Sequence, residues 1–176
     1  MSDAGPGPSV LWLVRHGESM GNLADAQAQE AGAGRLELDV RDPDVELSDT
    51  GRAQAGALGT WLAALPEDER PTAVLSSPFA RALTTAQLAT ADLGIRVRTD
   101  ERLRERDFGM FDRMTGAGIR EQFPDEAARR DMLGKFYYRP PGGEAGRTSR
   151  CASAACWPPR VCGTTASAWS SSPTRR

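Results

Sequence analysis

His16 stands in the stretch VLWLVRHGES and is the only histidine among the 176 residues of the chain. Arg15 precedes it, and Arg81 and Glu105 follow much later. An uncharged imidazole can attack phosphorus, and guanidinium groups fit the oxygens of a phosphoryl group and offset their charge. A carboxyl group that burial keeps protonated can donate a proton to a leaving alkoxide. Together these residues could transfer a phosphoryl group, provided that the fold brings them to one place.

The predicted strands offer a way to bring them together. Val10–Val14 is a continuous apolar run, which predicts a strand buried on both faces. Ala73–Leu75 and the alternating Ile95–Thr99 predict two further strands. His16 follows the first strand directly, and Glu105 comes just after the third. We therefore expect both side chains at the carboxyl ends of strands, where open α/β sheets place their ligand crevices.

Helical patterns separate the three strands. One helix is predicted from a Ser48 cap to Pro66, and the next begins at Ser77 and Pro78 and carries Arg81 in its first turn. Strand and helix alternate, which predicts an α/β fold with a mainly parallel sheet. The start of the second helix also offers free N–H groups and positive dipole to an anion. His16 and Arg81 are therefore expected in one crevice that binds a phosphoryl group.

Each residue alone also has an ordinary role. A histidine at a strand end is often only hydrogen-bonded, an arginine in the first turn of a helix is often solvated, and a glutamate among arginines is often in a surface ion pair. The DFG tripeptide at Asp107–Gly109 lacks the other kinase motifs, and we discard a kinase function. Cys151, Cys156 and Cys162 lack the paired short spacing of a zinc site, so no metal is assigned.

Composition narrows the range of partners. The chain has 22 basic and 24 acidic residues and a formal charge of -2, so it lacks the positive excess of a nucleic-acid-binding protein. It also lacks an apolar run of membrane-spanning length, and its MSDAGPGPSV start does not fit a secretory signal. We expect a flexible leader over residues 1–9, a cytoplasmic location and small-molecule partners. The composition does not indicate an oligomeric state.

Five motifs taken in order are more specific than any one residue. RHGESMGN, LSDTGRAQA, SSPFARALTTAQ, LRERDFG and PPGGE resemble the histidine phosphatase superfamily, the phosphoglycerate mutase-like enzymes, over residues 11–144. The resemblance implies a three-layer α/β sandwich, hydrolysis of phosphate monoesters and no cofactor. It makes His16 the phosphorylated nucleophile, Arg15, Asn22 and Arg81 ligands of the phosphoryl group, and Glu105 the proton donor that also contacts the substrate. A phosphatase is favoured over a mutase-type phosphotransferase, because residues after Gly109 do not resemble the mutase insertion.

The resemblance also implies a second histidine on a late apolar strand beside the first strand, and this chain has no other histidine. The domain at 10–144 is therefore expected to lack its last helix and strand, and to leave Val10–Val14 with unpaired backbone groups and an exposed apolar face. The chain could then be a non-catalytic remnant.

Residues 145–176 hold all three cysteines and no carboxylate, and they show no helical or strand period. One hypothesis is a natural disordered, low-complexity tail. The other is a base lost after the Glu144 codon, because the shifted codons are compatible with a helix WADVALRLRSVL and with VVTH, which restores a histidine. The nucleotide sequence across codon 145 distinguishes them. Substrate specificity is expected from residues 22–47 and from Phe108–Arg139, where helical turns are predicted at Gly116–Phe123 and Pro124–Leu133.

Overall fold

A computed structural model describes residues 8–146. Seven helices and strands lie in this range: α1 (Met20–Glu30), α2 (Asp49–Ala64), β1 (Val74–Ser76), α3 (Ala80–Thr90), β2 (Val97–Thr99), α4 (Gly116–Gln122) and α5 (Pro124–Tyr137). Short 3-10 turns connect them: η1 (Asp42–Asp44), η2 (Glu67–Glu69), η3 (Ala91–Leu93), η4 (Glu101–Leu103) and η5 (Gly109–Phe111). Residues 1–7 of the predicted leader and most of residues 145–176 lie outside the described range.

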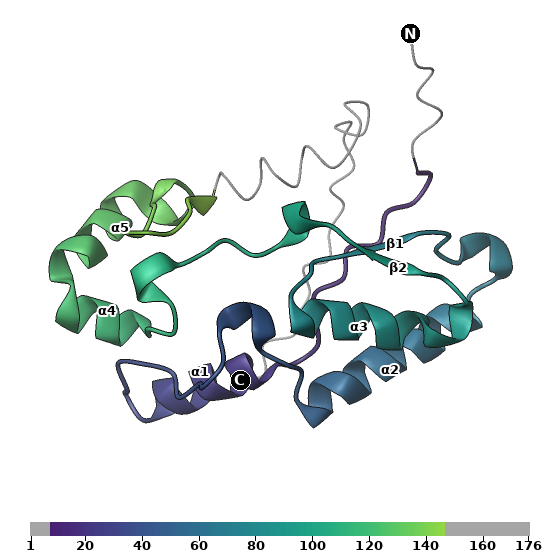
Figure 1. Cartoon of the computed structure of the whole chain (residues 1–176), viewed down its shortest axis with the longest axis horizontal. Helices are drawn as coiled ribbons and strands as arrows, with labels where there is room; N and C mark the ends of the chain where they lie inside the picture. The colour runs from purple at the N-terminus through teal and green to yellow at the C-terminus, as the bar shows by residue number, and fades with distance from the viewer. Residues whose placement is uncertain (1–7, 147–176) are drawn as a thin grey trace, which may run out of the picture.

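The α/β class with a parallel sheet is confirmed. β1 and β2 pair in parallel, with Val74 opposite Val97 and Ser76 opposite Thr99, and α3 connects them. The helices α2 and α3 lie side by side on one face of this sheet (Figure 1). Their close contact uses Gly59, because a Cβ there would lie 3.1 Å from the carbonyl oxygen of Leu88.

The predicted first strand is wrong. Val10–Val14 forms no strand, and its five apolar side chains are 43–87% exposed. A strand needs a hydrogen-bonded neighbour, and no described residue pairs with this backbone. The sequence predicts an exposed apolar face on this segment. The apolar residues are indeed exposed, although the segment forms no strand. An aromatic contact joins Trp12 of the segment to Trp61 of α2, with ring centroids 5.2 Å apart.

The predicted start of α3 also needs correction. The helix begins at Ala80 rather than at Pro78, and its N-cap residue Phe79 has an extended backbone. The Ser77 hydroxyl accepts a hydrogen bond from the Phe79 N–H at 3.3 Å, which forms a turn ahead of the helix instead of a cap on it. Arg81 still falls in the first turn, as predicted. The Ser48 cap of α2 is confirmed, because its hydroxyl accepts from the Gly51 N–H.

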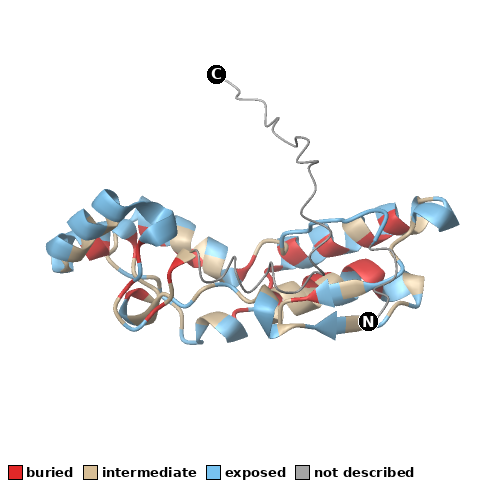
Figure 2. Ribbon diagram, turned by 90° about the horizontal axis from the view of Figure 1, so that it is seen from above, coloured by how far each residue is buried: buried red, intermediate tan, exposed pale blue. Residues whose placement is uncertain are grey.

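Buried residues gather in two places (Figure 2). One group lies between α2 and α3, with Ala55, Leu62 and Ala89. The other joins Phe111, Ile119 and Tyr138 from η5, α4 and the end of α5. Across the described residues, no helix is both long and apolar enough to cross a membrane.

A backbone crossing fixes the chain just after His16. A Cβ on Gly51 would lie 1.9 Å from the carbonyl oxygen of Glu18, and one on Gly17 would lie 2.5 Å from that of Gly51. The Ser48 N–H donates to the Glu18 carbonyl at 3.0 Å across the same contact. Only glycine permits so close an approach. The first turn of α2 therefore holds the segment that follows His16.

This crossing predicts opposite effects for two glycines of α2. Gly51→Ala should lower the free energy of unfolding by about 2 kcal/mol or more, because its Cβ would collide with backbone. Gly56→Ala is the matched control: nothing lies within 4 Å of its Cβ position, and alanine should raise stability by roughly 0.5–1 kcal/mol. Urea unfolding followed by tryptophan fluorescence measures both. Equal effects of the two substitutions would contradict the crossing.

Candidate functional site

His16 lies between the exposed N-terminal segment and the start of α1, which begins one residue after its N-cap Ser19. Its ring Nδ1 lies 2.7 Å from the carbonyl oxygen of Gly17. A carbonyl oxygen can only accept, so this hydrogen bond assigns the proton to Nδ1. The lone pair of Nε2 is then free to act as a nucleophile.

A chain of hydrogen bonds connects His16 to α3. The N–H of Gly17 donates to the hydroxyl of Thr85 at 3.1 Å, and that hydroxyl donates to the carbonyl oxygen of Arg81 at 2.7 Å. Thr85 is buried. The structure thus places the histidine segment against the first turns of α3, as expected for a shared site. The sequence analysis missed Thr85, whose only signal is its place one helical turn after Arg81.

The structure brings Arg81 and Glu105 into contact. The Arg81 Nη2 donates to Glu105 Oε2 at 3.2 Å, and the guanidinium is nearly buried. The same guanidinium binds a third residue that the sequence analysis missed: Nη1 donates to the Asp42 carbonyl oxygen at 2.7 Å and lies 3.0 Å from its Oδ1. Asp42 comes from η1, between α1 and α2. It carries no sequence signal, because only the tertiary fold brings it to Arg81.

Glu105 is not buried in the way that its proposed acid role needs. Its side chain is 53% exposed, although it pairs with Arg81. A bound substrate that covers this side chain would have to supply the remaining burial. Glu105 therefore contacts Arg81 while more than half of its side chain stays exposed.

Arg15 and Asn22 are placed differently from each other. Arg15 is exposed beside His16, and no ion pair or hydrogen bond of its side chain is found within residues 8–146. Asn22 belongs to the capping box of α1: its Oδ1 accepts from the Ser19 N–H at 3.0 Å and from the Ser19 hydroxyl at 3.1 Å. The cap fixes the Asn22 side chain through its oxygen. Its amide N–H groups can still donate to an anion near His16.

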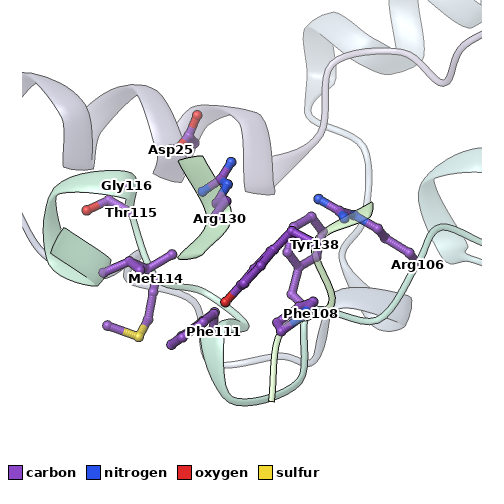
Figure 3. A pocket seen from close by; sticks show the side chains of 11 residues that line it. Asp25, Arg106, Phe108, Phe111, Met114, Thr115, Gly116, Arg130 and Tyr138 are labelled. Carbon is purple, nitrogen blue, oxygen red and sulfur yellow. The ribbon is translucent and has the colours of Figure 1, made fainter. Parts of the chain in front are cut away.

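A cavity of about 200 Å³ lies between α1, η5, α4 and α5 (Figure 3). It combines an apolar floor, which includes Phe111 and Met114, with the charged side chains of Asp25, Arg106 and Arg130. Most of its lining falls in residues 22–47 and 108–139, the segments expected to determine specificity. Arg106, which lines the cavity, directly follows the predicted proton donor Glu105 in the chain.

Tyr138 closes one side of this cavity and is buried. Its hydroxyl donates to Glu126 Oε2 at 2.7 Å. Burial of the phenol, followed by the hydrogen bond and the charge of Glu126, raises the pKa of Tyr138 from 10.0 to about 12. The neutral phenol is therefore part of the folded cavity.

Comparisons with known proteins add an independent line of evidence. The model of the histidine phosphatase superfamily (branch 1) matches residues 11–155. A phosphoglycerate mutase-like protein of Arabidopsis thaliana is 32% identical over 78% of this chain and 48% of its own length. A 6-phosphofructo-2-kinase/fructose-2,6-bisphosphatase of Gallus gallus is 33% identical over 78% of this chain and 25% of its own length. The chain thus spans about half or less of these curated relatives.

Solved structures share the fold. A mycobacterial glucosyl-3-phosphoglycerate phosphatase aligns with a TM-score of 0.62 and 30% identity, over 81% of this chain and 58% of its own. A putative alpha-ribazole-5'-P phosphatase from Escherichia coli aligns with a TM-score of 0.65 over 82% of this chain and 63% of its own. At 22% identity, that second likeness shows the fold alone.

The link from Gly17 to α3 yields a prediction for Thr85. Thr85→Val removes the acceptor of the Gly17 N–H and should destabilise the chain by about 1–3 kcal/mol. Thr85→Ser keeps the hydroxyl and is the control. Amide hydrogen exchange should show faster exchange at Gly17 in the valine variant only. An unchanged Gly17 rate in that variant would exclude this hydrogen bond as the anchor of the histidine segment.

The pKa of Tyr138 sets an alkaline limit on stability. Because folding raises this pKa, the stabilisation is fully present below about pH 10 and is lost as the pH rises towards about 12. Glu126→Gln should lower the pKa of Tyr138, although burial keeps it above that of a free phenol. Ultraviolet titration of tyrosinate in a Tyr137→Phe background isolates this group. A pKa that does not respond to Glu126→Gln would contradict the assigned pairing.

Proposed function

This chain belongs to the histidine phosphatase superfamily, and from that premise we propose that its parent reaction is hydrolysis of a phosphate monoester through a phosphohistidine on His16. The observation that carries the proposal is the tether between the Gly17 N–H, Thr85 and Arg81. It holds the segment that carries His16 against the first turns of α3, the helix that also carries the buried Arg81 guanidinium. An arginine next to a nucleophile is the arrangement that phosphoryl transfer needs.

In the proposed first step, the His16 Nε2 lone pair forms a bond to phosphorus while the phosphorus–oxygen bond to the alcohol breaks. Arg81 and Arg15 offset the charge of the equatorial oxygens, and the Asn22 amide donates to one of them. The leaving alkoxide takes a proton, for which we propose Glu105 as the donor. Water then attacks the phosphohistidine, Glu105 recovers a proton, and inorganic phosphate leaves. The step needs no metal or organic cofactor.

The substrate of this proposal is a small phosphate ester of the cytoplasm, and the alcohol part would extend into the cavity beyond Glu105. The apolar floor and the two arginines of that cavity suit a compact group that carries both carbon surface and negative charge. Several relatives act, by name, on phosphorylated sugars or glycerates. A phosphatase remains our preference over a mutase-type phosphotransferase.

One observation favours a second candidate function, a non-catalytic protein that only binds phosphate. His16 is the only histidine of the 176 residues, and Val10–Val14 has no strand beside it among the described residues. A second histidine would donate a further hydrogen bond to the phosphoryl oxygens. The described residues contain no second histidine. Our proposal that a reading-frame change altered residues 145–176 would account for this, and residues 147–176 lie outside the described structure.

Turnover of p-nitrophenyl phosphate separates the two functions. If the chain is an enzyme, His16→Ala should lower the rate by about 100-fold or more, because the nucleophile is lost. The intact chain should also acquire a phosphoryl label that is stable in alkali and lost in acid. Equal rates for the two proteins would remove the catalytic function and leave phosphate binding.

Glu105→Gln is the second arm of this experiment. p-Nitrophenolate leaves without much help from an acid, whereas an alkyl alkoxide needs a proton. The glutamine variant should therefore lose about tenfold more activity on an alkyl phosphate than on p-nitrophenyl phosphate. The same loss on both esters would rule out Glu105 as the proton donor.

A further inference from the structure

The Arg81 guanidinium, the phosphate ligand of the proposed function, is paired with a carboxylate of the chain itself. We propose that Asp42 is a further residue of the phosphate site: its carboxylate holds the Arg81 guanidinium in the free protein and is displaced when phosphate binds. This inference rests on the proposed function only in taking Arg81 as the phosphate ligand.

The contacts at Arg81 carry the argument. Nη1 lies 3.0 Å from Asp42 Oδ1, and Nη2 lies 3.3 Å from Asp42 Oδ2, so one carboxylate spans both terminal nitrogens. Two oxygens of a phosphoryl group bind the same pair of nitrogens in the same way. Nη2 also donates to Glu105 at 3.2 Å. A phosphoryl group can therefore take both terminal nitrogens only if Asp42 leaves them.

Burial determines which partner moves. The side chain of Arg81 is 6% exposed, whereas that of Asp42 is 39% exposed. The Phe79 ring packs against the arginine, with its centroid 5.1 Å from the guanidinium carbon, and Glu105 accepts a hydrogen bond from Nη2. The Asp42 carboxylate, in contrast, can rotate into water. Its displacement leaves the guanidinium preorganised for an anion.

The Asp42 backbone need not move with its side chain. The Asp42 carbonyl oxygen accepts from Arg81 Nη1 at 2.7 Å and also from the Val45 N–H at 3.3 Å. The bond from Arg81 holds η1 against α3 whether or not the carboxylate is bound. Rotation of one side chain is therefore sufficient to open the site.

Electrostatics gives the direction of the effect. Asp42 and Glu105 already offset the charge of Arg81, and a phosphate dianion beside both carboxylates would be repelled. Each binding event must break the Asp42 pair, which weakens the apparent affinity for phosphate. Asp42 thus favours ligands whose other contacts compensate for that loss, and it disfavours free inorganic phosphate.

Titration with inorganic phosphate by calorimetry tests the proposal on the full chain. Asp42→Asn should lower the dissociation constant about tenfold, because a charged competitor is removed. Asp44→Asn is the matched control: it removes the same charge from the same turn, but Asp44 pairs with the exposed Arg41. The control should change the constant less than twofold. Equal or weaker binding by Asp42→Asn would overturn the proposal.

A second measurement uses the unmodified chain, so it does not depend on folding of a variant. Phosphate should shift the carboxyl carbon resonance of Asp42 and leave that of Asp44 in place. An Asp42 resonance that stays unchanged while phosphate binds would overturn the displacement, although the phosphate site would stand. If neither the chain nor Asp42→Asn binds phosphate, both this proposal and the proposed function fail. Tighter binding by Asp42→Asn without turnover would support displacement alone.

Discussion

The hydrogen bond from the Gly17 N–H to Thr85 is the interaction on which the candidate site depends. No described strand pairs with the segment before His16, so a sheet does not position the histidine. Two other contacts position the histidine segment: the hydrogen bond to Thr85 on α3 and the glycine crossing with α2. Because α2 and α3 pack against each other, both contacts hold the segment that follows His16 against one pair of packed helices.

The same helix pair carries the positive charge that phosphoryl transfer needs. Arg81 is buried in the first turn of α3, where its guanidinium is satisfied by carboxylates from two distant segments. Burial makes its contacts strong and its position fixed, whereas the more exposed Asp42 and Glu105 can change partners. The site thus combines a rigid cation with movable anions. A substrate is selected by whether it replaces those anions and fills the adjoining cavity.

Local patterns predicted the parts of the fold that depend on nearby residues. The Ser48 cap, the place of Arg81 in the first turn and the parallel strands around α3 follow from residue types close in sequence. Val10–Val14 has the composition of a buried strand, but a strand forms only with a neighbour. Thr85 and Asp42 escaped notice for a related reason. Their roles exist only through contacts across 68 and 39 positions of the chain.

The central claim is that His16 and Arg81 share one anion site, and the single histidine makes this directly measurable. Nuclear magnetic resonance of the imidazole nitrogens follows His16 without overlap from other histidines. The account predicts that vanadate, a mimic of the phosphoryl group, shifts the His16 Nε2 signal in the intact chain and fails to do so after Arg81→Met. An Nε2 signal that ignores saturating vanadate, or that shifts equally without Arg81, would contradict it.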